Sequence, residues 1–189
     1  MPQNGLLDRI TEKNVPLRPI FFCGVFFEGL VSFHFARQTD GEEYRRKGEA
    51  ALIFMRNWAK HSQWNFEDKY LILEAEKMYL SGCHDDASQL YKDAIRSAHD
   101  HKLIHEEAIA SELAGDFFYE RSCPQKSLAL FKHSIKCYKE WGALAVARRV
   151  ESSMQSRFGL DIAQLGSIDD SLAFIFASQQ GSTKKRQEP

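Results

Sequence analysis

Several features that would mark a secreted, nucleic-acid-binding or zinc-binding protein are scarce or missing in this chain of 189 residues. Basic residues number 25 and acidic residues 26, so the chain has no basic surplus of the kind that general nucleic-acid binding requires. Only four cysteines occur, and none of them forms a CxxC pair, which argues against a zinc or redox motif. We therefore expect free thiols in a reducing, cytoplasmic compartment.

Sequence motifs that carry catalysis are missing as well. Gly24 and Gly29 are not followed by the Lys-Ser or Lys-Thr of a phosphate-binding loop, and no GxSxG elbow occurs. His99, His101 and His105 crowd one short stretch, but the sequence does not complete an HExxH motif. We interpret these histidines as a solvated edge. The sequence thus predicts a protein that is not an enzyme, with no catalytic residue, metal site or cofactor.

The N-terminal residues lack the apolar core and the cleavage site of a signal peptide, and we expect residues 1–17 to form an irregular arm. The most apolar run is Ile20–Ala36, which is short for a membrane span and contains Glu28 and His34. We expect this run to be a buried helix that is covered on most sides, without contact to a membrane. A membrane-associated helix is the alternative.

The positive signal in the sequence is an internal duplication. Residues 71–98 and residues 111–138 match when Tyr91 is aligned with Phe131, an offset of 40 positions. Each copy is typical of two helices joined by a tight turn, at Gly82 in the first copy and at Ser122 in the second. The aligned small residues are Ala75 with Gly115, Ala87 with Ser127, and Ala94 with Ser134.

Small residues at these places indicate where two antiparallel helices approach each other closely. Their spacing, with an aromatic residue between the last two, follows the tetratricopeptide pattern. The usual period of that pattern is 34 residues, so the extra residues here predict longer helices around residues 98–110. An ordinary helical bundle with coincidental spacing of small residues is the alternative.

The predicted fold class is all-α, with antiparallel helix pairs stacked as a short tetratricopeptide-like solenoid over residues 18–160. The first two helices resemble a degenerate earlier repeat, and a helix that ends at Gly159 covers the last repeat. We expect a short helix at residues 161–178 and a disordered tail at residues 179–189.

Four short sequences carry a resemblance to a known family: LEAE at Leu73–Glu76, HEEA at His105–Ala108, ELA at Glu112–Ala114, and YKEWGA at Tyr138–Ala143. The chain resembles, from roughly Phe26 to Arg157, the tetratricopeptide-like segment of very large signalling proteins. In that family the segment follows an AAA-type ATPase module and precedes GAF and histidine-kinase modules, often with a serine/threonine-kinase-like domain in front. None of the matched positions is catalytic in the family. Ser122 stands where the family tends to have glycine.

We therefore predict a non-enzymatic helical-repeat module for protein–protein interaction, a scaffold in signal transduction that is a fragment or a relative of such an ATPase or kinase. The alternative is a truncated gene model, in which the intact product is an ATP-dependent signalling kinase and this segment is its regulatory spacer. The genomic sequence on both sides of the reading frame distinguishes the two hypotheses.

The predicted binding surface is a stripe along the first helix of each copy, which lines the concave groove in tetratricopeptide folds. Its residues are three, four and three positions apart and therefore share one helical face. The stripe carries three carboxylates and one lysine, which favours a basic or arginine-bearing protein or peptide, with two tyrosines available for cation–π contact. A solvated face, or a groove filled by a neighbouring helix, is the alternative. The predicted stripe consists of Lys69, Ile72, Glu76 and Tyr79 in the first copy and Ile109, Glu112, Asp116 and Tyr119 in the second.

Overall fold

All regular secondary structure in the described part of the chain is α-helical, as the sequence predicts. A computed structural model describes residues 19–159 and Ile175. The predicted N-terminal arm, C-terminal helix and disordered tail therefore lie outside the described residues, apart from Ile175. The helices are α2 (Pro19–Thr39), α3 (Glu42–His61), α4 (Gln63–Leu80), α5 (His84–Asp100), α6 (Ile104–Glu120), α7 (Pro124–Trp141) and α8 (Leu144–Phe158).

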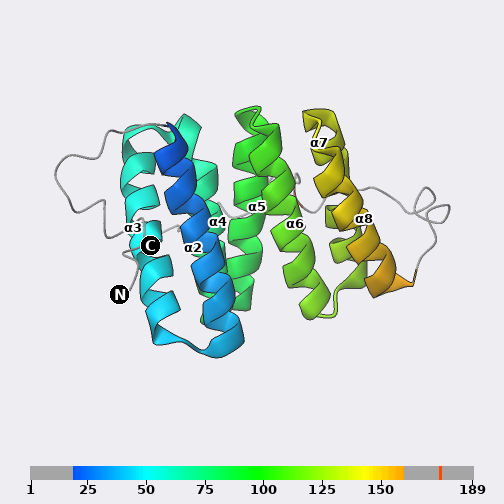
Figure 1. The fold of residues 1–189 in the computed structure, drawn as a ribbon, viewed down its shortest axis with the longest axis horizontal. Helices are drawn as coiled ribbons and strands as arrows, with labels where there is room; N and C mark the ends of the chain where they lie inside the picture. The colour runs from blue at the N-terminus through cyan, green and yellow to red at the C-terminus, as the bar shows by residue number, and fades with distance from the viewer. Residues whose placement is uncertain (1–18, 160–174, 176–189) are drawn as a thin grey trace, which may run out of the picture.

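The helices stand side by side in a row, with α2 and α3 together at one end and α8 at the other (Figure 1). Each helix from α2 to α7 packs against the next one along the chain. In addition α4 contacts both α2 and α6, its second neighbours along the chain. The contact between α4 and α6 brings the first helix of one copy against the first helix of the other.

Four of the turns between helices share one backbone conformation. Gly82, Lys102, Ser122 and Gly142 all have a positive φ, of 75°, 61°, 55° and 90°. In each turn the following N–H donates to the carbonyl five residues earlier, as in a Schellman motif; for example, Cys123 N lies 2.9 Å from the carbonyl oxygen of Phe118. Consecutive members of this set of four turn residues are 20 positions apart. Ser122 therefore makes the same tight turn as Gly82.

The small residues of the duplication are buried where helices meet. Ala87, Ala94, Ser127 and Ser134 have no exposed surface. A methyl group added at Gly115 would lie 3.0 Å from ring atoms of Phe131, and the Ser127 hydroxyl donates a 2.7 Å hydrogen bond to the Gly115 carbonyl. The alignment of the two copies therefore identifies positions that make close helix–helix contacts.

Helix α2 is less covered than the sequence predicts. Its run from Ile20 to Thr39 is a helix, as expected, and by length and composition alone it could cross a membrane, but only 39% of this run is buried. Phe27, Val31 and Phe35 are each 40% exposed or more. The prediction of cover on most sides is wrong, because the described helices that pack against α2 are α3 and α4.

The packed face of α2 depends on Gly29, which lies against α3 and α4. A Cβ atom at this position would lie 2.8 Å from the Cβ of Ala51 and 3.0 Å from the side chain of Leu73. Overpacking by Gly29→Ala costs about 1–3 kcal/mol, because the Cβ of Ala51 is fixed to the backbone and α2 must move away. A gain in helix propensity of about 1 kcal/mol offsets part of this cost, so we expect a net destabilisation of up to about 2 kcal/mol. Thermal unfolding followed by circular dichroism measures the difference.

The matched control is the exchanged pair, Gly29→Ala with Ala51→Gly. It retains one methyl group at the α2–α3 contact, and we expect it to recover part of the loss as a coupling between the two sites. A Gly29→Ala protein that melts at or above the wild-type temperature would show that the helices do not approach each other as described.

Candidate functional site

The centre of the predicted stripe lies inside the protein. Ile72 is fully buried, Ile109 is half-buried, and Glu76 is 2% exposed. The Glu76 carboxylate accepts a 2.5 Å hydrogen bond from the hydroxyl of Tyr91 on α5. Its other oxygen pairs with Arg37 on α2. Burial, and after it the neighbouring Glu76 carboxylate, raises the pKa of Tyr91 well above its usual value. Ile72 and Glu76 therefore present almost no surface to a partner in this structure.

The second half of the stripe is more accessible but is paired within the chain. Glu112 accepts hydrogen bonds from Tyr138 at 2.9 Å and from Arg149 on α8 at 2.7 Å. Asp116 pairs with Arg157, also on α8, and its side chain is 36% exposed. Burial raises the pKa of Asp116 above its usual value, although Arg157 acts in the opposite direction. The carboxylates of α6 thus bind the arginines of the last helix.

Both stripe tyrosines have an arginine of a neighbouring helix over the ring. The guanidinium carbon of Arg37 lies 4.5 Å from the centroid of Tyr79, and that of Arg157 lies 5.2 Å from the centroid of Tyr119. The Tyr79 hydroxyl also donates to Glu120, and burial followed by this hydrogen bond raises the pKa of Tyr79. Tyr119 remains 38% exposed. The sequence predicts that a partner's arginine pairs with a carboxylate and stacks on a tyrosine of the stripe. In the structure Arg37 of α2 and Arg157 of α8 already make these contacts.

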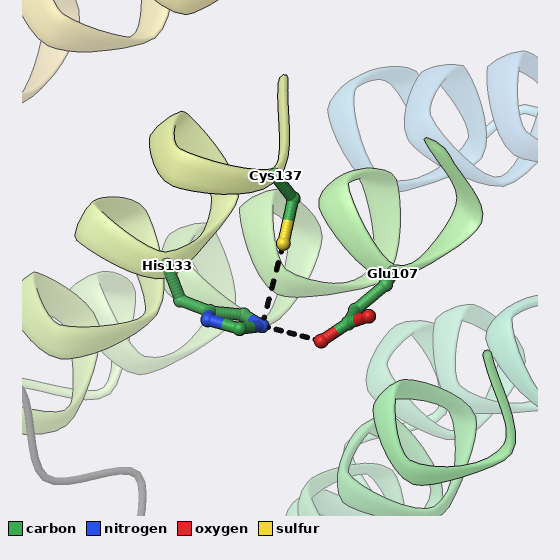
Figure 2. Close-up of side chains that lie close together, drawn as sticks. All are labelled: Glu107, His133 and Cys137. Carbon is green, nitrogen blue, oxygen red and sulfur yellow. Dashed lines mark hydrogen bonds and ion pairs between the residues drawn. The ribbon is translucent and has the colours of Figure 1, made fainter. Parts of the chain in front are cut away.

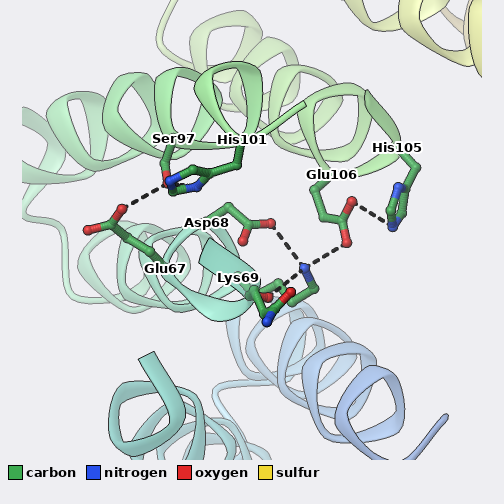
Figure 3. Close-up of polar contacts among 8 residues, drawn as sticks. Glu67, Asp68, Lys69, Ser97, His101, His105 and Glu106 are labelled. Carbon is green, nitrogen blue, oxygen red and sulfur yellow. Dashed lines mark hydrogen bonds and ion pairs between the residues drawn. The ribbon is translucent and has the colours of Figure 1, made fainter. Parts of the chain in front are cut away.

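Lys69 belongs to a buried polar cluster between α4 and α6 (Figure 3). Its ammonium nitrogen lies 2.6 Å from Glu106 and 3.2 Å from Asp68, and it donates to the Asn65 carbonyl at 3.1 Å. Burial raises the pKa of Asp68. Burial also acts to raise the pKa of Glu106, but hydrogen bonds from His105 and Lys69 outweigh it and the pKa is lowered. This cluster joins the two helices of the stripe from within.

The three neighbouring histidines do not converge. His101 lies near Ser97 (Figure 3) and its ring is 4.6 Å from that of Trp64. His105 stacks on Trp141 at 5.2 Å. His99 faces a different group of side chains, on α6 and α7. The predicted solvated edge is found for His99 and His105, whose side chains are 47% and 40% exposed. The turn between α5 and α6 points the three side chains toward different neighbours.

The group that His99 faces is a buried cluster of three potential metal-ligating side chains, Glu107, His133 and Cys137 (Figure 2). Glu107 Oε1 lies 2.7 Å from His133 Nε2 and 3.1 Å from His99 Nδ1. Cys137 Sγ lies 3.5 Å from His133 Nε2. Burial acts to raise the pKa of Glu107, but the hydrogen bond to His133 and the charge of both histidines lower it. We call Glu107, His133 and Cys137 the Glu–His–Cys cluster.

The residues predicted from the sequence do not include this cluster, because its cysteine belongs to no CxxC pair. His133 and Cys137 are four residues apart on α7, the spacing that places two side chains on one helical face. That signal was present in the sequence. The contribution of Glu107 was not, because it depends on how α6 packs against α7.

No protein-family model matches the chain, and neither the curated proteins nor the solved structures that were searched include a match. The resemblance to signalling ATPases and kinases therefore stays a prediction.

Proposed function

We propose that this protein is a non-enzymatic module for protein–protein interaction, built as a short tetratricopeptide-like solenoid. The contacts of α4 with α2 and with α6 support this proposal most strongly, because contacts between alternate helices give a solenoid its inner face. The equally spaced turns at residues 82, 102, 122 and 142 support it as well, since each of α5, α6 and α7 then forms, with its turn, a unit of the same length.

The partner that suits the inner face is a basic, arginine-bearing helix or peptide. Within the chain, the carboxylates and tyrosines of this face already hold Arg37, Arg149 and Arg157. The half of the face formed by α6 keeps exposed surface at Asp116 and Tyr119. A partner arginine that binds there would meet the same pair of groups, one carboxylate and one aromatic ring.

Fluorescence polarisation with the full chain and two labelled peptides tests this proposal. One peptide is an amphipathic helix with arginines along one face, and the other carries glutamate in place of each arginine. We expect the arginine peptide to bind more tightly, and its affinity to fall as salt is added, because exposed charge pairs are screened. We also expect the Asp116→Lys chain to bind the arginine peptide more weakly than the wild-type chain does.

Glu140→Lys is the matched control, because it makes the same charge change at an exposed position on α7 outside the predicted stripe. Circular dichroism on each variant separates lost binding from lost folding. Equal binding of both peptides, or binding that is indifferent to salt and to Asp116→Lys, would contradict the proposed inner-face site.

A further inference from the structure

The Glu–His–Cys cluster joins α6 and α7, with His99 of α5 at its edge. Glu107 is in the first turn of α6, whereas His133 and Cys137 lie one turn apart on α7. One ligand atom from each of the three residues lies within 4.8 Å of the other two. The three atoms are an oxygen, a nitrogen and a sulfur, which is the set of donors that Zn²⁺ accepts in proteins.

The spacing of these atoms is close to that of a tetrahedral zinc site. Zinc–ligand bonds of about 2.0–2.3 Å place neighbouring ligand atoms roughly 3.3–3.7 Å apart. The Sγ–Nε2 distance between Cys137 and His133 is 3.5 Å, which already falls in this range. The distance of 2.7 Å between His133 and Glu107 has to widen by roughly 0.6 Å, which a small rotation of the Glu107 side chain provides.

The surroundings of the cluster also fit a bound cation. Glu107 is 6% exposed and Cys137 is 4% exposed, so a carboxylate and a thiol with little access to water face each other across one imidazole. A bound metal ion would bind the thiolate and release the thiol proton to solvent.

We propose that Glu107, His133 and Cys137 bind one Zn²⁺ ion, with one water molecule as the fourth ligand. His99 pairs with the oxygen of the ligating carboxylate and acts as a positioning residue that orients it. The ion ties the beginning of α6 to α7. This site uses none of the residues of the predicted stripe. A failure of the metal-binding test therefore does not contradict the proposed function, and the reverse also holds.

Titration of the reduced, metal-free full chain with Co²⁺ tests the site, because cobalt reports its ligands in the absorption spectrum. We expect one Co²⁺ per chain, with a near-ultraviolet charge-transfer band from the Cys137 thiolate and the intense visible bands of a tetrahedral site. Added Zn²⁺ should remove both. We also expect Zn²⁺ to raise the melting temperature in a concentration-dependent manner, because it binds the folded state.

Three variants test the two ligands Cys137 and Glu107 and the positioning residue His99. Cys137→Ser should lose the charge-transfer band, and Glu107→Gln should weaken Co²⁺ binding by at least about tenfold. His99→Ala should keep the band while affinity falls roughly 10–100-fold, as for a residue that orients a ligand. Cys123→Ser is the matched control, because this thiol lies outside the cluster, and it should bind as the wild type does.

Circular dichroism of each metal-free variant establishes that it is folded. If Cys137→Ser does not fold, Glu107→Gln still tests the site, because the amide keeps the shape of the carboxylate. The proposal is overturned if the wild type shows no charge-transfer band, if the band persists in folded Cys137→Ser, or if Glu107→Gln binds Co²⁺ as tightly as the wild type.

Discussion

Glu76→Lys is expected to destabilise the protein by about 3–5 kcal/mol, the cost of removing one partner from a buried ion pair. The Glu76 carboxylate is 2% exposed and holds Arg37 and the Tyr91 hydroxyl. The substitution leaves both groups without their acceptor and adds a second cation beside Arg37. Chemical denaturation with urea measures the loss, and the linear dependence of free energy on urea extrapolates it to water.

Glu140→Lys makes the same change where the side chain is 53% exposed, and we expect its effect to be small because surface ion pairs contribute little. A Glu76→Lys protein as stable as Glu140→Lys would show that the Arg37–Glu76–Tyr91 contact does not hold the fold together. The result also affects binding studies, since Glu76→Lys cannot serve as a simple probe of partner charge if it unfolds the chain.

Ala94→Phe is the second substitution with a large expected effect. Ala94 on α5 is fully buried at a position where the duplicated pattern requires a small residue. A phenyl ring there has no space, and overpacking typically costs about 1–3 kcal/mol, or roughly 3–10 °C in melting temperature. Differential scanning calorimetry measures the change.

Ala145→Phe is the control for this prediction, because it makes the same substitution at an exposed position on α8. We expect it to leave the melting temperature nearly unchanged. If Ala94→Phe and Ala145→Phe had the same melting temperature, the alignment of the two copies would not identify the packed positions.

Much of the helical architecture could be predicted from the sequence because it depends on local rules. Small residues recur 40 positions apart, and the structure buries both sets. Gly142 and Gly159 end helices in the left-handed conformation that glycine adopts readily, and Pro124 begins α7, where its missing N–H lacks a partner in any case. These features depend on a few neighbouring residues, which is why periodicity and composition suffice to find them.

The sequence could not distinguish a helix face that binds a partner from one that packs against a neighbouring helix. The spacing of the predicted stripe placed its residues on one face of α4 and one face of α6, and its chemistry suggested an arginine-bearing partner. Periodicity says which residues share a face but not what lies opposite. In the structure α2 and α8 place Arg37 and Arg157 over the two tyrosines, and the stripe keeps exposed surface mainly at Asp116 and Tyr119.

The sequence by itself determined that the chain is helical, where several of its helices end, and which small residues lie between them. Only the tertiary structure decided which charges are buried and which side chains meet. Glu106 and Glu107 illustrate the reason: they are adjacent in sequence, yet one pairs with Lys69 of α4 and the other with His133 of α7. Successive helical residues point about 100° apart, so their partners depend on the packing of other helices, which no local pattern records.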